Sequence, residues 1–450
     1  MKKILILLSL FAVLLSCTPK QGQKQTIEDT TITAENRADW FKESKFGIFA
    51  HWGLYSILSG SYNGHTLPDT TLANGRSWYA EWIQQRLEVP AEEYHQLEKQ
   101  FNPVNFDADA WISEVKNAGA RYFVITAKHH DGFAMWDSKV SDFDLGNSPY
   151  KGDLLGDLAK ACKKYGIKYG FYYSHWHDWH HPQGAVPHWQ PTRPDDEFEA
   201  YWREKSLPQI RELIELYDPD LFWFDTWNEE SHINETRRDE LIAMIRELSP
   251  KCLINGRISF YNPGEEIDFL EMHDNNYPDK ILEKPWQTPA TMVHSWGWHA
   301  KDFNWKPAQR MLGYLLSNTS KGGNYLLNIG PRPDGTFPPA AIHRLREMGG
   351  WLYANGDAVY GAKPVKLDGI PENVILTQKE VDGKNIIYAC ITKPMEEVVL
   401  PFTIRKQTEC SILETGMPLD IISYNNNQLK IILPSKIFAD NNIQVIKIEM

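Results

Sequence analysis

The stretch Leu221-Phe222-Trp223-Phe224-Asp225 is a short apolar run that ends in a carboxylate. A run of this length, rich in aromatic residues, is typical of a strand that is buried on both faces. The segment before it, Trp202 to Leu216, has the apolar period of an amphipathic helix, and so does Arg237 to Leu248 after it. A buried strand between two helices predicts a βαβ unit and therefore a parallel sheet.

The same alternation extends along the chain in both directions, with further helices predicted at Ala108 to Ala118 and Leu154 to Tyr165. Eight apolar runs have the character of buried strands: Phe46–Ala50, Tyr122–Thr126, Lys168–Tyr173, Leu221–Asp225, Cys252–Asn255, Ile267–Glu271, Thr291–His294 and Asn324–Asn328. Eight strands parted by helices predict an α/β fold of the (β/α)8 barrel type over residues 38–361, a length that suits such a barrel. A helix from Pro338 to Tyr353 is expected to close this catalytic domain.

The pattern changes over residues 362–450. Short apolar runs are separated there by turns rich in Gly, Asn and Pro, and no helical period is present: Val374–Thr377, Asn385–Ile391, Glu397–Leu400, Leu429–Leu433 and Ile443–Ile448. Such runs are typical of antiparallel strands. The sequence therefore predicts a C-terminal antiparallel β-sandwich after the barrel.

The first residues have the features of a targeting segment. Lys2 and Lys3 precede an apolar run, Ile4 to Leu15, that is too short to span a bilayer. The following Leu14-Leu15-Ser16-Cys17 resembles a bacterial lipobox, in which Cys17 is lipidated. We expect a lipoprotein signal peptide at 1–17 and a tether at 18–37. The chain would then be exported and lipid-anchored, facing the periplasm or at the outer membrane, and it would touch a membrane only through that anchor. An ordinary signal peptide with an incidental cysteine is the alternative.

The amino-acid composition argues against some classes of binding partner and favours others. The net charge of −12 argues against nucleic acid, since phosphates need a basic surface. The 17 Trp residues favour sugar binding, because indole faces stack on the apolar face of a pyranose. The cysteines after Cys17 form no CxxC pair, so neither a disulfide framework nor a zinc site is predicted. A Cys390–Cys410 disulfide remains open.

Polar and titratable residues follow six successive strands, where barrel enzymes place their chemistry: His51, Lys128 to Gly132, Tyr172 to Ser174, Asp225, Arg257 and Glu271 to Asp274. This pattern predicts an active site. Asp225 is our candidate nucleophile, and an N-cap of the next helix is the alternative. A carboxylate nucleophile requires a second carboxyl group as acid, and the candidates lie in the segment from Ile267 to Asn275.

His129 and His130 could suggest a metal site. Adjacent side chains on an extended segment point to opposite faces, so we expect these two histidines not to share one metal ion. No metal and no cofactor is predicted. Neutral imidazoles that bond to sugar hydroxyl groups are the better interpretation.

With these motifs in place, the chain resembles the α-L-fucosidases of glycoside hydrolase family 29 over residues 40–361. The resemblance rests on the order of several separate motifs: Trp40-Phe41, Lys45 to Gly53, Glu81-Trp82, Ala118 to Ala120, Thr126 to Phe133, Trp223 to Asp225, Asn255 to Arg257, Ser295 to Gly297 and Gly322 to Pro331. It implies an exo-acting enzyme that removes terminal α-L-fucose from oligosaccharides or glycoconjugates with retention of configuration. A C-terminal β-sandwich is also part of this family.

The resemblance also implies roles for single residues. Asp225 matches the nucleophile, which forms a fucosyl-enzyme ester. The positions that match the fucose-binding residues are His51, Glu81, Trp82, His129, His130, Tyr172, Trp223, Arg257 and Trp296. Trp296 would offer apolar surface to the C5 methyl group.

The general acid is where this sequence departs from its family. Many relatives have a Trp-Glu pair before the Ser-Trp-Gly motif, but this chain has Trp286-Gln287, and an amide cannot serve as acid and base. Asp274 is favoured as the acid over Glu271. Because this departure borders the leaving group, two alternatives stay open. One is an α-L-galactosidase with the same mechanism, for which His294, His299 or Asn276 would be responsible. The other is a fucose-binding lipoprotein with weakened catalysis.

Overall fold

The computed structural model describes residues 31–227, 232–260, 262–424, 428–438 and 442–450. The predicted signal peptide, Cys17 and most of the predicted tether lie outside these ranges. Within these ranges, no helix has both the length and the apolar character that are needed to span a bilayer.

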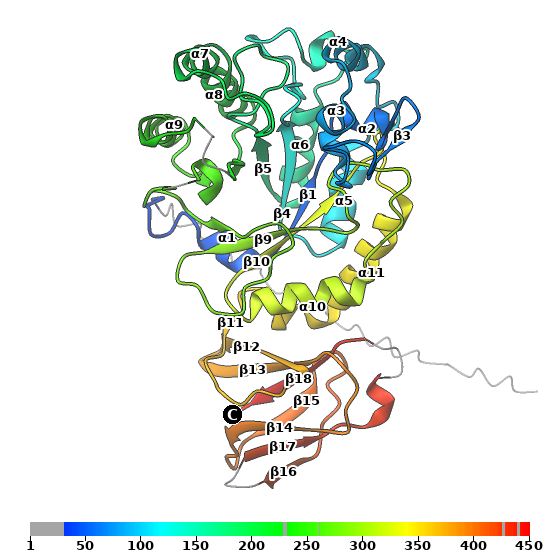
Figure 1. Cartoon of the computed structure of the whole chain (residues 1–450). Helices are drawn as coiled ribbons and strands as arrows, with labels where there is room; N and C mark the ends of the chain where they lie inside the picture. Colours follow the sequence, from blue (N-terminus) through cyan, green and yellow to red (C-terminus); the bar gives the residue numbers. More distant parts are fainter. Residues whose placement is uncertain (1–30, 228–231, 261, 425–427, 439–441) are drawn as a thin grey trace, which may run out of the picture.

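A ring of parallel strands forms the larger part of the molecule (Figure 1). Its strands are β1 (Phe46–Ala50), β4 (Tyr122–Lys128), β5 (Lys168–Tyr173), β6 (Leu221–Trp223), β7 (Leu253–Ile254), β8 (Leu270–Glu271), β9 (Trp286–Thr291) and β10 (Asn324–Ile329). They are ordered β7-β6-β5-β4-β1-β10-β9-β8, and each hydrogen-bonded pair is parallel. A bridge between Asn255 and Phe269 joins the two outer strands. The predicted (β/α)8 barrel is confirmed.

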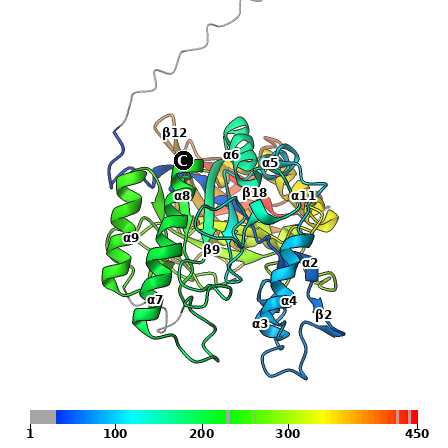
Figure 2. The same ribbon diagram turned by 90° about the horizontal axis from the view of Figure 1, so that it is seen from above.

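Helices surround this ring. The longer ones are α5 (Ala108–Asn117), α6 (Leu154–Tyr165), α7 (Asp195–Tyr201), α8 (Leu207–Tyr217), α9 (Glu235–Leu248), α10 (Ala308–Thr319) and α11 (Pro339–Asn355), and α1 (Asp39–Ser44) precedes β1. The segment after β1 carries the shorter α2 (Tyr55–Leu58), α3 (Ile83–Arg86) and α4 (Ala91–His95), and the hairpin of β2 (Ser61–Tyr62) and β3 (His65–Thr66). Figure 2 shows α8 and α9 on one side of the barrel and α4 on the other.

Two predicted elements differ from the structure. The seventh strand was expected to begin at Thr291, but β9 ends there and starts at Trp286. Pro289 lies in this strand. A proline has no N–H to donate to a neighbouring strand, so its presence in a sequence argues against a central strand. The helix expected from Trp202 starts as α-helix at Leu207, since residues 202–206 form a π-helical turn that joins α7 to α8.

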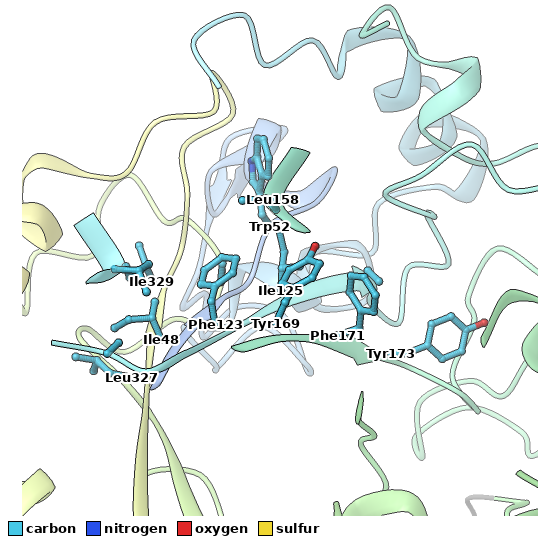
Figure 3. Close-up of a cluster of buried hydrophobic side chains, with 14 of the residues drawn as sticks. Ile48, Trp52, Phe123, Ile125, Leu158, Tyr169, Phe171, Tyr173, Leu327 and Ile329 are labelled. Atoms are coloured by element: carbon cyan, nitrogen blue, oxygen red, sulfur yellow. The ribbon is translucent and has the colours of Figure 1, made fainter. Parts of the chain in front are cut away.

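Successive side chains of each strand point to opposite faces of the sheet, and this alternation divides the barrel core into two clusters. Phe123 and Ile125 of β4, and Tyr169 and Phe171 of β5, point outward and pack under the helices (Figure 3). The residues between them face inward and form a second cluster, which includes Phe49, Tyr122, Val124, Tyr172, Leu221, Trp223, Leu253, Phe269 and Leu326. Leu221 and Trp223 of β6 belong to this inner cluster. Asp225 follows two residues beyond the carboxyl end of the strand, where the mouth of the barrel lies.

The C-terminal part consists of two antiparallel sheets. One has the order β11-β12-β13-β18-β15 and the other the order β14-β17-β16. Their strands are β11 (Lys363–Pro364), β12 (Val374–Val381), β13 (Lys384–Ile391), β14 (Glu397–Thr403), β15 (Glu409–Ile412), β16 (Ile421–Tyr424), β17 (Gln428–Ile432) and β18 (Gln444–Glu449). Side chains of both sheets share one core, among them Leu376, Ile387, Leu400 and Ile431. The predicted β-sandwich is confirmed.

The sandwich lies against α10 and α11 (Figure 1), and Trp351 of α11 donates from Nε1 to the carbonyl of Ile443 at 2.8 Å. The disulfide left open between Cys390 and Cys410 is not formed. Both thiols are free and buried, and β18 separates their strands.

Gly47 of β1 offers a test of packing inside the barrel. A Cβ atom at this position would lie 2.3 Å from the ring of Tyr122, which is fully buried. We expect Gly47→Ala to lower the free energy of unfolding by about 1–3 kcal/mol, the usual cost of overpacking. Urea unfolding followed by tryptophan fluorescence measures this change.

The matched control is Gly313→Ala in α10, where an added Cβ meets no atom within 4 Å. This substitution should be neutral or stabilise the protein by up to about 1 kcal/mol, because alanine is the better helix former. Equal destabilisation by both variants would contradict this account of the core.

Candidate active site

A cavity of ≈ 670 Å³ opens at the carboxyl ends of the barrel strands. All twelve residues that the sequence nominates for catalysis or sugar binding line it: His51, Glu81, Trp82, His129, His130, Tyr172, Trp223, Asp225, Arg257, Glu271, Asp274 and Trp296. They come from the ends of β1, β4, β5, β6 and β8, from the loops after β7 and β9, and, for Glu81 and Trp82, from a short 3-10 helix (Ala80–Trp82) in the segment after β1. The tertiary structure thus brings the whole predicted set to one place.

Asp225 lies two residues beyond the end of β6 and is nearly buried, with 9% of its surface exposed. Its Oδ2 accepts a hydrogen bond from the Tyr172 hydroxyl at 2.8 Å, and its Oδ1 accepts one from Arg257 at 3.0 Å. Burial raises the pKa of this carboxyl, and the arginine opposes that shift. The alternative role as a helix cap does not hold, because Asn234 caps α9.

Arg257 is the link between two carboxylates. Its Nη1 donates to Asp225, and its Nη2 donates to Oδ1 of Asp274 at 2.8 Å and to the carbonyl of Met272 at 2.7 Å. The pKa of Arg257 rises above its ordinary value, since both carboxylates favour the charged guanidinium despite its burial. Two carboxyl groups bound to one guanidinium lie close together, as the double displacement of a retaining glycosidase requires.

Glu271 has a different environment from Asp274. Its Oε1 accepts a hydrogen bond from Nε2 of Gln287, which in turn accepts from the hydroxyl of Tyr122, so this chain leads into the barrel interior. Its Oε2 is shielded and has no hydrogen-bond partner among the described residues. Burial raises the pKa of Glu271 well above its usual value. By contrast, the side chain of Asp274 is 34% exposed at the cavity edge.

Three histidines deep in the cavity, His51, His129 and His130, are neutral near pH 7. Burial lowers the pKa of His51 to about 4 and holds those of His129 and His130 well below the ordinary value. The expectation that His129 and His130 face opposite sides is wrong, since both line the cavity with ring centroids 4.2 Å apart. The reason is that β4 ends at Lys128, so this pair lies in an irregular segment where strand alternation does not apply.

Two features suit the cavity to a polyhydroxylated ligand. Trp223 Nε1 and His129 Nδ1 are shielded atoms with no partner in the described part of the chain. The rings of Trp223 and Tyr172 stack at 5.3 Å, and Trp296 lies 5.0 Å from the ring of His51. Among the described residues, no three His, Cys, Asp or Glu side chains are grouped as metal ligands. Polar donors beside aromatic faces are suited to a pyranose.

Glu81 is buried, and it lies next to Trp82 in the lining of the cavity. Its Oε2 accepts a hydrogen bond from the backbone N–H of Gly297 at 2.8 Å, and the Ser295 hydroxyl lies 3.5 Å away. These bonds tie the short helix that carries Glu81 and Trp82 to the segment that carries Trp296. Burial raises the pKa of Glu81 to about 7.

Sequence reasoning missed the outer wall of the cavity. Its lining also includes Tyr79, Arg86, His188, Trp189, Thr226, Trp227, Ser259 and Phe260. Arg86 follows Trp82 by one helical turn, a spacing that places both on one face and could have been noticed. Trp189 lies in a long irregular segment after β5, where no pattern connects it to Trp82.

A (β/α)8 barrel whose mouth holds two carboxyl groups on one arginine, among aromatic rings and neutral histidines, defines a glycoside hydrolase site. Comparison with known proteins gives the family. Residues 12–357 match the family described as α-L-fucosidase. The chain therefore belongs to the α-L-fucosidase family.

Individual relatives agree. The tissue α-L-fucosidase of Rattus norvegicus is 30% identical over 388 residues, which cover 83% of this chain and 80% of that protein. The α-L-fucosidase isoenzyme 1 of Paenibacillus thiaminolyticus has a solved structure with 31% identity and a TM-score of 0.78, covering 93% of this chain and 99% of the other. The solved structure of a trapped covalent intermediate of a Bacteroides thetaiotaomicron α-L-fucosidase is 27% identical to this chain, with a TM-score of 0.79. The match covers 92% of this chain and 95% of the other.

The raised pKa of Glu81 predicts a pH dependence of stability. The folded protein holds this proton up to about pH 7, whereas the unfolded chain releases it near the ordinary value of 4.5. Wild type therefore loses stability relative to Glu81→Gln as the pH rises from about 4.5 to 7, by up to roughly 3 kcal/mol. Urea unfolding at several pH values measures the difference.

An exposed carboxylate provides the control. Glu347→Gln on α11 should leave the pH dependence of unfolding close to that of wild type. A constant difference between wild type and Glu81→Gln from pH 5 to 8 would show that Glu81 does not titrate in this window.

Proposed function

We propose that this protein is an exo-acting, retaining α-L-fucosidase that hydrolyses terminal α-L-fucosyl linkages of glycans through a fucosyl-enzyme intermediate. One observation carries the assignment of roles: Asp225, held by Tyr172 and Arg257, shares that arginine with Asp274. Membership of the α-L-fucosidase family supports the substrate class, and a relative trapped as a covalent intermediate supports the retaining course.

In the first step an oxygen of Asp225 attacks the anomeric carbon and forms an ester. The bond from that carbon to the glycosidic oxygen breaks, and the leaving oxygen takes the proton of the acid, Asp274. In the second step water attacks the anomeric carbon and gives a proton back to Asp274. The ester breaks, and fucose leaves with the configuration it had in the substrate.

The residues around Asp225 suit these steps. Arg257 and Tyr172 orient the carboxylate, because each bonds to one of its oxygens. His51, His129 and His130 are neutral and can bond to ring hydroxyl groups without a charge that would oppose the oxocarbenium-like transition state. Trp296 supplies an apolar face for the methyl group of fucose.

The α-L-galactosidase alternative loses its support. It depended on His294, His299 or Asn276 near the sugar, and none of the three belongs to the described cavity lining. His294 stacks on Trp78, and His299 bonds to the carbonyl of Leu67. The alternative of a weakened binding protein depended on Gln287 and Asn276. Gln287 bonds to Glu271, and neither residue belongs to the described cavity lining.

Asp274 is the better acid on geometry. It lies at the cavity edge, where a leaving group departs and water enters, and it shares Arg257 with the nucleophile. Glu271 is turned toward Gln287 and the barrel interior. A general acid must first reach the oxygen that it protonates.

The nucleophile is tested with an aryl α-L-fucoside. We expect Asp225→Asn to lower kcat by at least about 10³-fold, since no other group can form the ester. Azide added to Asp225→Gly should restore turnover and yield fucosyl azide of inverted configuration. Asp196→Asn on α7 is the matched control, with activity close to wild type. Undiminished fucose release by Asp225→Asn would refute the assignment.

The acid is tested by changing the leaving group. Asp274→Asn should lower kcat/KM for a fucosyl disaccharide by about 10²- to 10⁴-fold, and much less for a dinitrophenyl fucoside, whose leaving group needs no proton. Glu271→Gln should not show this dependence on the leaving group. If Glu271→Gln shows it and Asp274→Asn does not, the two roles are reversed.

We also propose that the protein is an exported lipoprotein anchored through Cys17, at the periplasmic or outer-membrane face. The charged start, the short apolar run and the Leu-Leu-Ser-Cys motif support this proposal. The anchor would keep the enzyme near the envelope, where glycans are degraded.

Metabolic labelling with an alkyne fatty acid in a bacterial host tests the anchor. The full-length chain should be labelled and should fractionate with membranes, whereas Cys17→Ala should be neither labelled nor processed at this position. Cys162→Ala, a buried cysteine of α6, is the control and should be labelled like wild type. Equal labelling of Cys17→Ala would overturn the proposal.

A further inference from the structure

The outer wall of the cavity carries a cation that the proposed reaction does not use. Arg86 ends α3 and lines the cavity together with Trp82 and Trp189. From Asp225 outward the wall runs through His130, whose Nε2 lies 3.7 Å from the carboxylate, to Trp82, whose ring lies 5.1 Å from His130. Arg86 lies beyond Trp82 and thus in the direction away from the fucose.

Arg86 is held in place by two rings and one carbonyl. Its Cζ lies 4.8 Å from the ring centroid of Trp189 and 5.4 Å from that of Trp82. Its Nη1 donates to the carbonyl of Asn74 at 3.0 Å. Gln190 bonds to Gln85 at 2.6 Å, which fastens the segment of Trp189 to α3. The cation is therefore positioned before any ligand arrives.

The charge of Arg86 is not neutralised by a contact. No carboxylate of the described chain forms an ion pair with it, and its Nη2 has no hydrogen-bond partner there. Its Nε is shielded and also without a partner in the described ranges. A partly exposed arginine with a free amino group, on the wall of a sugar cavity in a chain of net charge −12, indicates an anionic ligand.

The position of Arg86 relative to the acid, Asp274, suits contact with the leaving group of the substrate. Tyr79, Asp274 and Arg86 line the same cavity, so the acid and the cation face one space. A sugar that receives the proton of Asp274 would extend along this wall, with its ring against indole faces.

We propose that Arg86, Trp82 and Trp189 form a subsite for the sugar next to fucose, and that this subsite selects a sugar bearing an anionic group, a carboxylate or a sulfate ester. The indole rings bind the apolar face of the pyranose, and Nη2 of Arg86 binds the anion. The inference rests on the proposed fucosidase function, because it takes the sugar beyond Trp82 to be the leaving group.

A second role for Arg86 would be that of counter-ion to the buried Glu81. The two charges do act on each other. The hydrogen bonds of the Glu81 carboxylate, however, come from Gly297 and Ser295. The two roles differ in outcome, since a counter-ion would affect every fucoside alike.

Binding to the Asp225→Asn protein separates these possibilities without turnover. Three methyl glycosides of fucosyl-α-(1→2)-galactose serve as probes: the neutral disaccharide, its galactose 6-sulfate and its galacturonic acid analogue. We expect one or both acidic probes to bind about 5- to 20-fold more tightly at low salt, and this advantage to shrink in 0.5 M NaCl. Titration calorimetry measures the three Kd values, and the better acidic probe identifies the anion.

Adding Arg86→Gln should abolish the advantage and leave the Kd of the neutral probe within about twofold, whereas Arg86→Lys should retain part of it. Arg211→Gln on α8, which removes one exposed positive charge elsewhere, should keep the advantage in full. Equal binding of all three probes, or a loss of all three alike with Arg86→Gln, would overturn the inference. Failure of the parent enzyme to hydrolyse an aryl fucoside would refute the proposed function instead, and the two failures are thus distinct.

Discussion

The guanidinium of Arg257, bonded to both Asp225 and Asp274, is the contact on which the site depends. Two carboxylates close together in a partly buried cavity repel one another, and burial raises the pKa of Asp225. The positive charge of Arg257 between them offsets this repulsion, and its hydrogen bonds fix the position of the two carboxylates relative to each other. It also keeps Asp225 within reach of ionisation, since burial by itself raises the pKa of that group.

This contact in turn requires the barrel to close between β7 and β8, where the strands have only two residues each. The side chain of Asn255 bonds to both the N–H and the C=O of Phe224, and the N–H of Gly256 bonds to the carbonyl of Phe269. These bonds replace the ladder that longer strands would supply. They hold the end of β6, the Arg257 segment and the start of β8 in register.

The cavity has two zones with different physical character. Around Asp225 the histidines are buried and neutral, so the zone binds a neutral sugar through hydrogen bonds and aromatic faces. Further out, Arg86 is partly exposed and fixed between two indole rings. The first zone is built on strand ends, and the second is built on α3 and an irregular segment. Substrate class and leaving-group preference are therefore carried by different parts of the fold.

The sequence by itself determined the fold class and the inner zone. The apolar run from Leu221 to Phe224 predicts a buried strand with Asp225 at its carboxyl end, and parallel strands bring their carboxyl ends to one mouth. Features that do not follow from a regular helix or strand period became clear only from the tertiary structure. The pair His129–His130 follows a strand end, β9 contains Pro289, and Trp189 reaches Arg86 from a distant irregular segment. Local patterns report which face a residue takes within an element, whereas contacts between irregular segments depend on how the whole chain packs.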